Sequence, residues 1–481
     1  MDDDVRGFLH SFAELVEMAH RSMGAQDGEP LADRLTAYLG TPVADVAVVT
    51  EEVMNHRYAD WDVALAEVAG RDPQAAEVGV GGGDMRHHVS LGDLVGSGHG
   101  RASVGQVDYV SVAVGPQEHR RAIGLGLRLF RYAGHPVVVM QRKGNPQYGR
   151  DRGTLELLCV DEDTRTALLD ELRVVALERS VLRGQVIAFE SSGYGPEAQG
   201  VTFLPRPDVG EDQVVLPHGS LDRITAHVSG IAEHADTLRR HGQHLKRGLL
   251  LYGPPGTGKT HTVRHLVSRS PDHTVVLLAG ESLGYISLAA SLARALQPAV
   301  VVLEDCDLVA EDRSMGPGGR PLLFEVLDAM DGLDSDADVT FLLTTNRAQA
   351  LERALVQRPG RVDLAVEIPL PDEAGRRRLL ELYQADLAFG EEALAEAAHR
   401  TEGMTASFVK ELVRRAVLLA AMSAQEPGDE HLHEALDGLL TSQEELTRVL
   451  LGNSRPGDVE GSMAPGMTAW EEGGGCGDPY G

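Results

Sequence analysis

The sequence predicts an α/β fold with a parallel central sheet, a helical region after it, and an α+β domain and a helical segment before it. Three observations predict this fold. The apolar run 249–251 enters a glycine-rich loop that opens a helical segment; the apolar runs 274–280, 298–304 and 339–346 alternate with helical patterns; and after residue 371 only helical patterns remain. Strands that alternate with helices favour a parallel sheet covered on both faces.

Length and charge limit the possible classes of protein. A chain of 481 residues predicts several domains rather than one core. The formal net charge of −29 argues against a nucleic-acid partner or an anionic membrane surface. There is no apolar run long enough to span a membrane, the N-terminus is acidic where a signal peptide is basic, and the cysteines have no metal-ligand spacing. We therefore expect a cytoplasmic location.

The N-terminal half is predicted to contain a helical region, residues 1–90, and an α+β domain, residues 106–210. Leu31, Leu35 and Leu39 repeat at helical spacing, and the glycine-rich stretches 78–84 and 96–105 are typical of a linker. Period-two patterns in the second domain predict strands at 109–114, 125–134, 136–142, 154–160, 184–190 and 200–205, with a helix at 165–180. This domain has no catalytic cluster, so we expect a recognition or scaffold role.

The core domain, residues 211–370, centres on the stretch RGLLLYGPPGTGKTHT at 247–262, which matches G-x-x-x-x-G-K-[ST]. Glycines let the loop adopt positive φ and turn backbone N–H groups toward phosphate oxygens. We expect Lys259 to be a surface-loop charge for the β- and γ-phosphates of ATP, and Thr260 to be a ligand of Mg²⁺. The candidate nucleotide-binding residues are Gly253, Pro254, Pro255, Gly256, Thr257, Gly258, Lys259, Thr260 and His261.

Two acidic residues stand at the end of the predicted core strand 298–304. The run 298–307 reads PAVVVLEDCD, a buried parallel strand whose carboxyl end faces the nucleotide. We expect Glu304 to hold Mg²⁺ through water and Asp305 to polarise the attacking water. Asn346 ends the strand after that and is expected to reach the γ-phosphate.

The segment TNRAQALERALVQRPGRVD at 345–363 resembles the AAA family of ATPases at its second region of homology. The resemblance implies an AAA+ P-loop core with a C-terminal helical lid, and a homohexameric ring. It also implies that Asn346 is the sensor and that Arg358 and Arg361 act as arginine fingers in the neighbouring subunit's site. Charge stabilisation supplied in this way couples hydrolysis to assembly.

The acid order is a departure from most of the family, which carries Asp before Glu. Here Glu304 precedes Asp305, so the catalytic acid is one methylene shorter. In this order, and in FRYAG at 130–134 and LRGQVIAFE at 182–190, the chain resembles the ATPases that assemble respiratory complex III and their soluble bacterial chaperone-like relatives.

The resemblance also implies roles outside the phosphate loop. Residues 371–452 would form the lid, in which Tyr383 and the turn 403–407 line the adenine and ribose, while Arg376 to Arg378 read as a solvated helix face. Tyr285 and Ile286 resemble a pore-loop pair, with a buried tyrosine as the alternative. The glycine-rich tail, residues 453–481, is expected to be disordered.

Together these features predict a Mg²⁺-dependent ATPase ring that remodels, unfolds or chaperones protein clients. One alternative is a proteasome-type regulatory ATPase that docks a protease through the tail Pro479-Tyr480-Gly481; the sequence contains no H-E-x-x-H of a built-in zinc protease. Another is an ATP-gated scaffold with little turnover.

Overall fold

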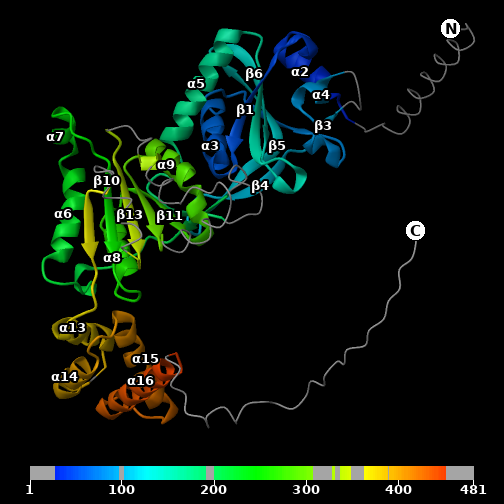
Figure 1. Cartoon of the computed structure of the whole chain (residues 1–481). Helices are drawn as coiled ribbons and strands as arrows, with labels where there is room; N and C mark the ends of the chain where they lie inside the picture. Colours follow the sequence, from blue (N-terminus) through cyan, green and yellow to red (C-terminus); the bar gives the residue numbers. More distant parts are fainter. Residues whose placement is uncertain are drawn as a thin grey trace, which may run out of the picture. The chain divides into compact units, whose positions relative to one another are not determined.

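The structure, a computed structural model, describes residues 28–96, 102–190, 200–306, 328–330, 336–347, 362–387 and 389–450. It divides into two compact units, Met1–Pro371 and Asp372–Gly481, which are described separately (Figure 1). The first unit contains two sheets, and the second contains helices. The α/β fold with a parallel sheet and a C-terminal helical region is therefore confirmed.

The first sheet of the first unit is antiparallel, in the order β1-β7-β6-β5-β2-β3 with β4 beside β5. Its strands are β1 (Val48–Met54), β2 (Ala76–Val80), β3 (Val104–Gly105), β4 (Asp108–Ala113), β5 (His119–Tyr132), β6 (His135–Arg142) and β7 (Arg152–Leu158). The helices packed with it are α2 (Leu31–Leu39), α3 (Tyr58–Ala69), α4 (Leu91–Val95) and α5 (Glu162–Glu178), with 3₁₀ turns at Val43–Asp45, Asn55–Arg57, Asp84–His87 and Pro146–Tyr148.

Both faces of this sheet are buried. Alternate residues along a strand point to opposite faces, so Leu127 and Leu129 pack with α2 and α4, whereas Phe130 packs with α3 and α5. The four strands and the helix predicted between residues 109 and 180 are confirmed. Helix α5 begins after Asp161, whose side chain accepts a hydrogen bond from Thr164 N–H.

The predicted boundary at residue 90 is wrong for the described residues. Strands β1 and β2 lie inside the region expected to be helical, and they pair with β7 and β5 of the same sheet. Val78 and Val80 are buried strand residues, and a Cβ on Gly79 would lie 1.9 Å from the Gln106 carbonyl. Gly79 therefore permits two backbone segments to approach closely. Composition alone predicts a flexible linker for this glycine-rich stretch.

The second sheet has the order β14-β10-β13-β12-β11-β8-β9, and all its pairs are parallel except β8 with β9. Its strands are β8 (Val186–Phe189), β9 (Val201–Leu204), β10 (Arg247–Tyr252), β11 (Thr274–Ala279), β12 (Ala299–Glu304), β13 (Val339–Thr345) and β14 (Leu364–Glu367). The helices are α6 (Ser220–Glu233), α7 (Ala235–Arg240), α8 (Lys259–Ser268) and α9 (Ile286–Ala295), with 3₁₀ turns at Glu211–Gln213 and Gly280–Tyr285.

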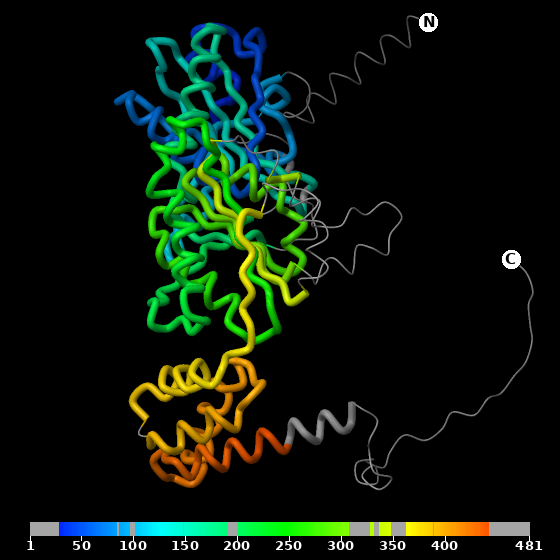
Figure 2. The backbone as a smooth tube through the Cα atoms, turned by 60° about the vertical axis from the view of Figure 1, so that its left-hand side comes forward, coloured from blue at the N-terminus to red at the C-terminus, as the bar shows by residue number. Residues whose placement is uncertain are grey.

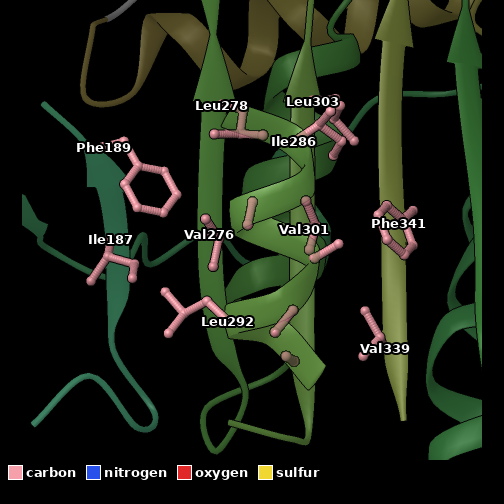
Figure 3. Packing of buried hydrophobic residues seen from close by; sticks show 14 of the residues in the cluster. Ile187, Phe189, Val276, Leu278, Ile286, Leu292, Val301, Leu303, Val339 and Phe341 are labelled. Atoms are coloured by element: carbon pink, nitrogen blue, oxygen red, sulfur yellow. The ribbon is translucent and has the colours of Figure 1, made fainter. Parts of the chain in front are cut away.

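Helices cover both faces of the second sheet. Helix α9 packs on one face, where Ile286 and Leu292 meet Val276, Val301 and other strand residues (Figure 3). Helices α6 and α8 pack on the other face. The predicted core boundary at residue 211 is also wrong, because β8 and β9 belong to this sheet. Their own pattern predicted strands but could not show which sheet they join, since that depends on the distant pairing of Val186 with Val275.

Contacts between the two sheets of the first unit centre on the end of α5 and on β8. Asp60 is fully buried, and its carboxylate accepts hydrogen bonds from Ser180 Oγ at 2.9 Å and Val181 N–H at 2.8 Å, and from Arg57. The His56 ring meets Phe189 of β8 edge to face, with a centroid separation of 5.7 Å. These contacts fix the segment that joins the first sheet to the second.

The second unit contains α13 (Glu373–Gln384), α14 (Glu391–Arg400), α15 (Ala406–Met422) and α16 (Asp429–Leu450), which follow one another from yellow to red in Figure 2. Helix α13 packs on α14 and α15, and α16 packs on α15. Arg376 corrects the expectation of a solvated arginine face, because it is only 4% exposed and its Nε donates to Ala398 O at 2.8 Å. That bond satisfies a carbonyl in the last turn of α14.

Within the described residues, no helix is long and apolar enough to cross a membrane. The predicted tail, residues 453–481, and residues 1–27 lie outside the described residues.

His56 makes stability depend on pH. Burial, with the Arg57 charge beside it, lowers the pKa of His56 to about 4, from an ordinary value of 6.5. Below pH 6.5 this histidine takes up a proton in the unfolded chain but not in the folded chain. The contribution of His56 to the free energy of unfolding is therefore fully present above pH 6.5 and is lost as the pH falls toward 4. The loss attributable to this group reaches ~3 kcal/mol.

We expect the urea-unfolding free energy of His56→Gln to fall less steeply across this pH range than that of the wild type. His135→Gln, at an exposed position, is the matched control and should leave the slope unchanged. Equal slopes for wild type and His56→Gln would contradict the assignment.

Candidate functional site

The candidate site starts with the loop between β10 and α8. Gly253, Gly256 and Gly258 have φ values of 146°, 77° and 105°, as the motif predicted. Gly253 has a second constraint, because a Cβ there would lie 2.2 Å from Ile368 O. Ile368 N–H donates to Tyr252 O at 2.7 Å and so holds the chain after β14 against the start of the loop.

Lys259 lies inside the loop rather than on its surface, which corrects the expectation. It is only 6% exposed, and its Nζ donates to Gly253 O at 2.9 Å and to Pro254 O at 2.8 Å. Thr257 Oγ1 donates to the same Pro254 carbonyl at 2.9 Å. The loop therefore surrounds its own ammonium group, so replacing Lys259 also removes contacts that shape the loop.

The helix α8 begins at Lys259 and points its N-terminus into this loop. The first backbone N–H groups of a helix point out of its N-terminus and favour an anion. The side chain of His261 lies against the segment that precedes α6, with Nε2 at 3.0 Å from Gln213 O, and His265 Nδ1 lies 2.9 Å from Val209 O. We infer that the His261 side chain acts by positioning that segment.

Arg206 holds the other end of α8. Its guanidinium donates to four carbonyl oxygens, those of Gly184, Val267, Ser270 and His273, at 2.8 to 3.1 Å. A cation is favourable at a helix C-terminus. The sequence analysis did not identify Arg206, because a single arginine in a proline-rich segment forms no motif that would indicate this role.

Glu304 and Thr260 meet at the carboxyl end of β12. The Thr260 hydroxyl lies beside the Glu304 carboxylate and acts to lower its pKa. Burial raises the pKa of Glu304, the Asp305 charge raises it further, and the Thr260 hydroxyl and the Arg264 charge oppose this. A hydroxyl and a carboxylate are hard oxygen ligands that suit Mg²⁺, which usually keeps several waters and takes other ligands from phosphates. The pair therefore fits the ion, although the described residues contain no group of three His, Cys, Asp or Glu able to hold a metal by themselves.

Asp305 follows β12 in an unusual backbone conformation, with a φ of 52°. Asn346 Nδ2 donates to Asp305 Oδ1 at 3.4 Å, so the shorter acid does reach the predicted sensor residue. Thr344 contacts the backbone on both sides of Asp305: its Oγ1 accepts from Asp305 N–H and its carbonyl accepts from Cys306 N–H, each at 3.0 Å. Sequence reasoning missed Thr344; the signal was a polar residue inside a buried strand.

Three other predicted features have different outcomes. Arg358 and Arg361 lie outside the described residues. Tyr285 and Ile286 pack into the core, with Ile286 fully buried and the Tyr285 ring 6.0 Å from that of Phe189, which favours the buried alternative over a pore loop. Tyr383 and the turn 403–407 belong to the second unit, so their nucleotide contacts stay a prediction.

The two ends of the phosphate loop should respond differently to an added methyl group. Gly253→Ala introduces both positive-φ strain, about 1–2 kcal/mol, and a collision with Ile368 O. Gly258→Ala introduces the strain alone, since no atom of the described residues beyond its chain neighbours lies within 4 Å of its Cβ position.

We therefore expect Gly253→Ala to lower the free energy of unfolding more than Gly258→Ala does, as measured by urea denaturation. Equal losses would show that the approach of Ile368 does not constrain the loop.

Comparisons with known proteins agree with this geometry. Residues 249–370 match the family described as ATPase family associated with various cellular activities (AAA). The chain is 34% identical over 263 residues to a proteasome-activating nucleotidase of Methanoculleus marisnigri, which covers 52% of this chain and 64% of that protein. It is 30% identical over 298 residues to an ATP-dependent zinc metalloprotease FtsH 1 of Sphaerobacter thermophilus, covering 56% of this chain and 45% of the relative. The chain thus spans about half to two thirds of these relatives, and it carries an AAA ATPase domain homologous to theirs.

Proposed function

We propose that the protein is a Mg²⁺-dependent ATPase that assembles into a ring and uses ATP hydrolysis to remodel, unfold or chaperone protein clients. One observation carries the proposal: the phosphate loop, the Thr260–Glu304 pair and the Asp305–Asn346 pair converge where parallel strands end. Each pair supplies a separate requirement of phosphoryl transfer.

Nucleotide binding is assigned to the loop 253–260. The α8 N-terminus and the loop N–H groups would hold the phosphates, and the Lys259 ammonium, already directed into the loop, would face the β- and γ-phosphates. Thr260 and Glu304 would hold Mg²⁺. When bound, that ion supplies positive charge that offsets the charge on the β- and γ-phosphates.

Water activation is assigned to Asp305. Its carboxylate is fixed by Asn346 on one side and by the backbone turn on the other. A carboxylate held in this way can accept a proton from water and align it for in-line attack. Asn346 would contact both the acid and the γ-phosphate, which links the position of the base to the presence of substrate.

The ring belongs to the proposal through Arg358 and Arg361, which would complete the neighbouring subunit's site. A homohexamer is what the resemblance of residues 345–363 to the AAA family implies. The similarity to proteasome-activating nucleotidases and to the FtsH metalloproteases supports the second candidate function, in which clients pass to a protease. An ATP-gated scaffold is the remaining alternative, and steady-state ATPase measurements separate it from both.

Two finer assignments rest on sequence alone. The order Glu304-Asp305 supports a relationship to the respiratory complex III assembly ATPases and their soluble bacterial relatives. The cysteine pattern supports a cytoplasmic location.

The two acids should have separable roles. Asp305→Asn should leave ATP affinity within a few-fold of the wild type and lower kcat at least ~100-fold, because it removes a base but no phosphate contact. Glu304→Gln should instead raise the Mg²⁺ concentration needed for activity. Asp236→Asn changes a carboxylate that is 95% exposed and is the control. The reverse pattern would show that the acids exchange roles.

Subunit mixing tests the ring. An Arg361→Ala subunit keeps its own Lys259 and Asp305 but deprives its neighbour of a finger, while a Lys259→Ala subunit is inactive yet still offers its fingers. A finger is worth on the order of a thousandfold in rate, so mixing the two inactive variants should restore measurable hydrolysis. If subunit exchange is verified independently and activity does not rise, the finger in trans is wrong.

A further inference from the structure

Asp305 has an unusual backbone conformation for a residue that is not glycine. Strand β12 ends at Glu304, and the next residue adopts a φ of 52°, a left-handed conformation that favours glycine. Asparagine and aspartate enter this region more readily than other residues, but only where local contacts hold them there. The contacts that hold Asp305 therefore determine where its carboxylate lies.

Thr344 provides those contacts from the neighbouring strand. Leu303 of β12 is in register with Leu343 of β13, so Thr344 stands beside the turn that begins at Glu304. Its hydroxyl accepts from the Asp305 N–H and its carbonyl accepts from the Cys306 N–H, each at 3.0 Å. The side chain is fully buried. One residue thus fixes the peptide groups before and after the Asp305 Cα.

The residue that follows β13 contacts the Asp305 side chain. Asn346 comes two residues after Thr344, and its Nδ2 donates to Asp305 Oδ1 at 3.4 Å. Asp305 is therefore held at its backbone by Thr344 of β13 and at its carboxylate by Asn346, the residue directly after β13.

We propose that Thr344 is a positioning residue that holds Asp305 in its left-handed turn, and that this turn brings the short aspartate side chain to the Asn346 amide. The inference rests on the proposed function, in which Asp305 activates water. An aspartate is one methylene shorter than a glutamate, and here the turned backbone compensates for that length. Without the hydroxyl, the Asp305 N–H loses its partner and the turn loses the contact that opposes its strain.

Thr340 is a matched control on the same strand. It lies four residues before Thr344 and so faces the same side of β13. It is also fully buried, but its hydroxyl has no hydrogen-bond partner within the described part of the chain. Valine has the shape of threonine without the hydroxyl, so Thr340→Val and Thr344→Val make the same chemical change in similar surroundings.

The experiment uses the full chain and measures steady-state ATP hydrolysis with saturating Mg²⁺, ATP affinity by fluorescent-nucleotide displacement, and Tm. Thr344→Val is expected to lower kcat about ten- to a hundredfold with ATP affinity within about twofold, because β13 and its pairing with β10 are preserved. Thr344→Ser, which keeps the hydroxyl, should recover most of the lost kcat. Thr340→Val should hydrolyse ATP at the wild-type rate.

Each alternative outcome has one meaning. A wild-type kcat for Thr344→Val overturns the positioning role while the proposed function stands. Equal losses in Thr340→Val and Thr344→Val, or no recovery in Thr344→Ser, also overturn it, since either result shows a general packing effect. If Thr344→Val does not fold, the kcat of Thr344→Ala is compared with that of Thr344→Ser instead. A wild-type protein that binds ATP but does not hydrolyse it overturns the proposed function, and the inference with it.

Discussion

The parallel pairing of β10, β12 and β13 is the constraint on which the candidate site depends. Tyr252 is in register with Thr345, and Leu303 with Leu343, so the three strands end at the same level of the sheet. Residues that follow different strands then meet without any long loop having to bring them together. The phosphate loop, the two acids and Asn346 are neighbours for this reason, and each is held by backbone that the buried sheet makes rigid.

The sequence predicted the strands and helices of both sheets better than it predicted their partners. Apolar and period-two patterns report whether a residue is buried, and this is a local property. Pairing is not local: β1 and β2 come early in the chain but complete a sheet made mostly of later strands. Strand β1 carries Glu51 and Glu52 at the sheet edge, and β2 contains the close-packed Gly79. Both features weaken the sequence pattern that indicates a strand. As a result, the predicted boundary between the first two domains, at residue 90, is wrong.

At the site, the motif predicted the phosphate loop, whereas the residues that hold the loop and the acids in place had no such signal. The positive φ values of the three loop glycines follow from the motif, because a phosphate loop cannot form without them. The burial of Lys259 and the roles of Thr344 and Arg206 depend on hydrogen bonds to backbone groups distant in sequence. Such bonds leave no periodic pattern, since any residue has a backbone carbonyl that can accept them.

The position of β8 determines how the first unit can be divided. It lies between β11 and β9, and its contact with His56 and the neighbouring Asp60–Val181 bond attach it to the first sheet as well. A core taken from residue 211 onward would lose both strands and leave one edge of β11 unpaired, which is costly for a largely buried strand. Arg206 would also be lost, and with it the contacts at the C-terminus of the phosphate-loop helix. Residues 180–190 and 200–206 are therefore part of the nucleotide-binding core in physical terms, although in sequence they read as the end of the preceding domain.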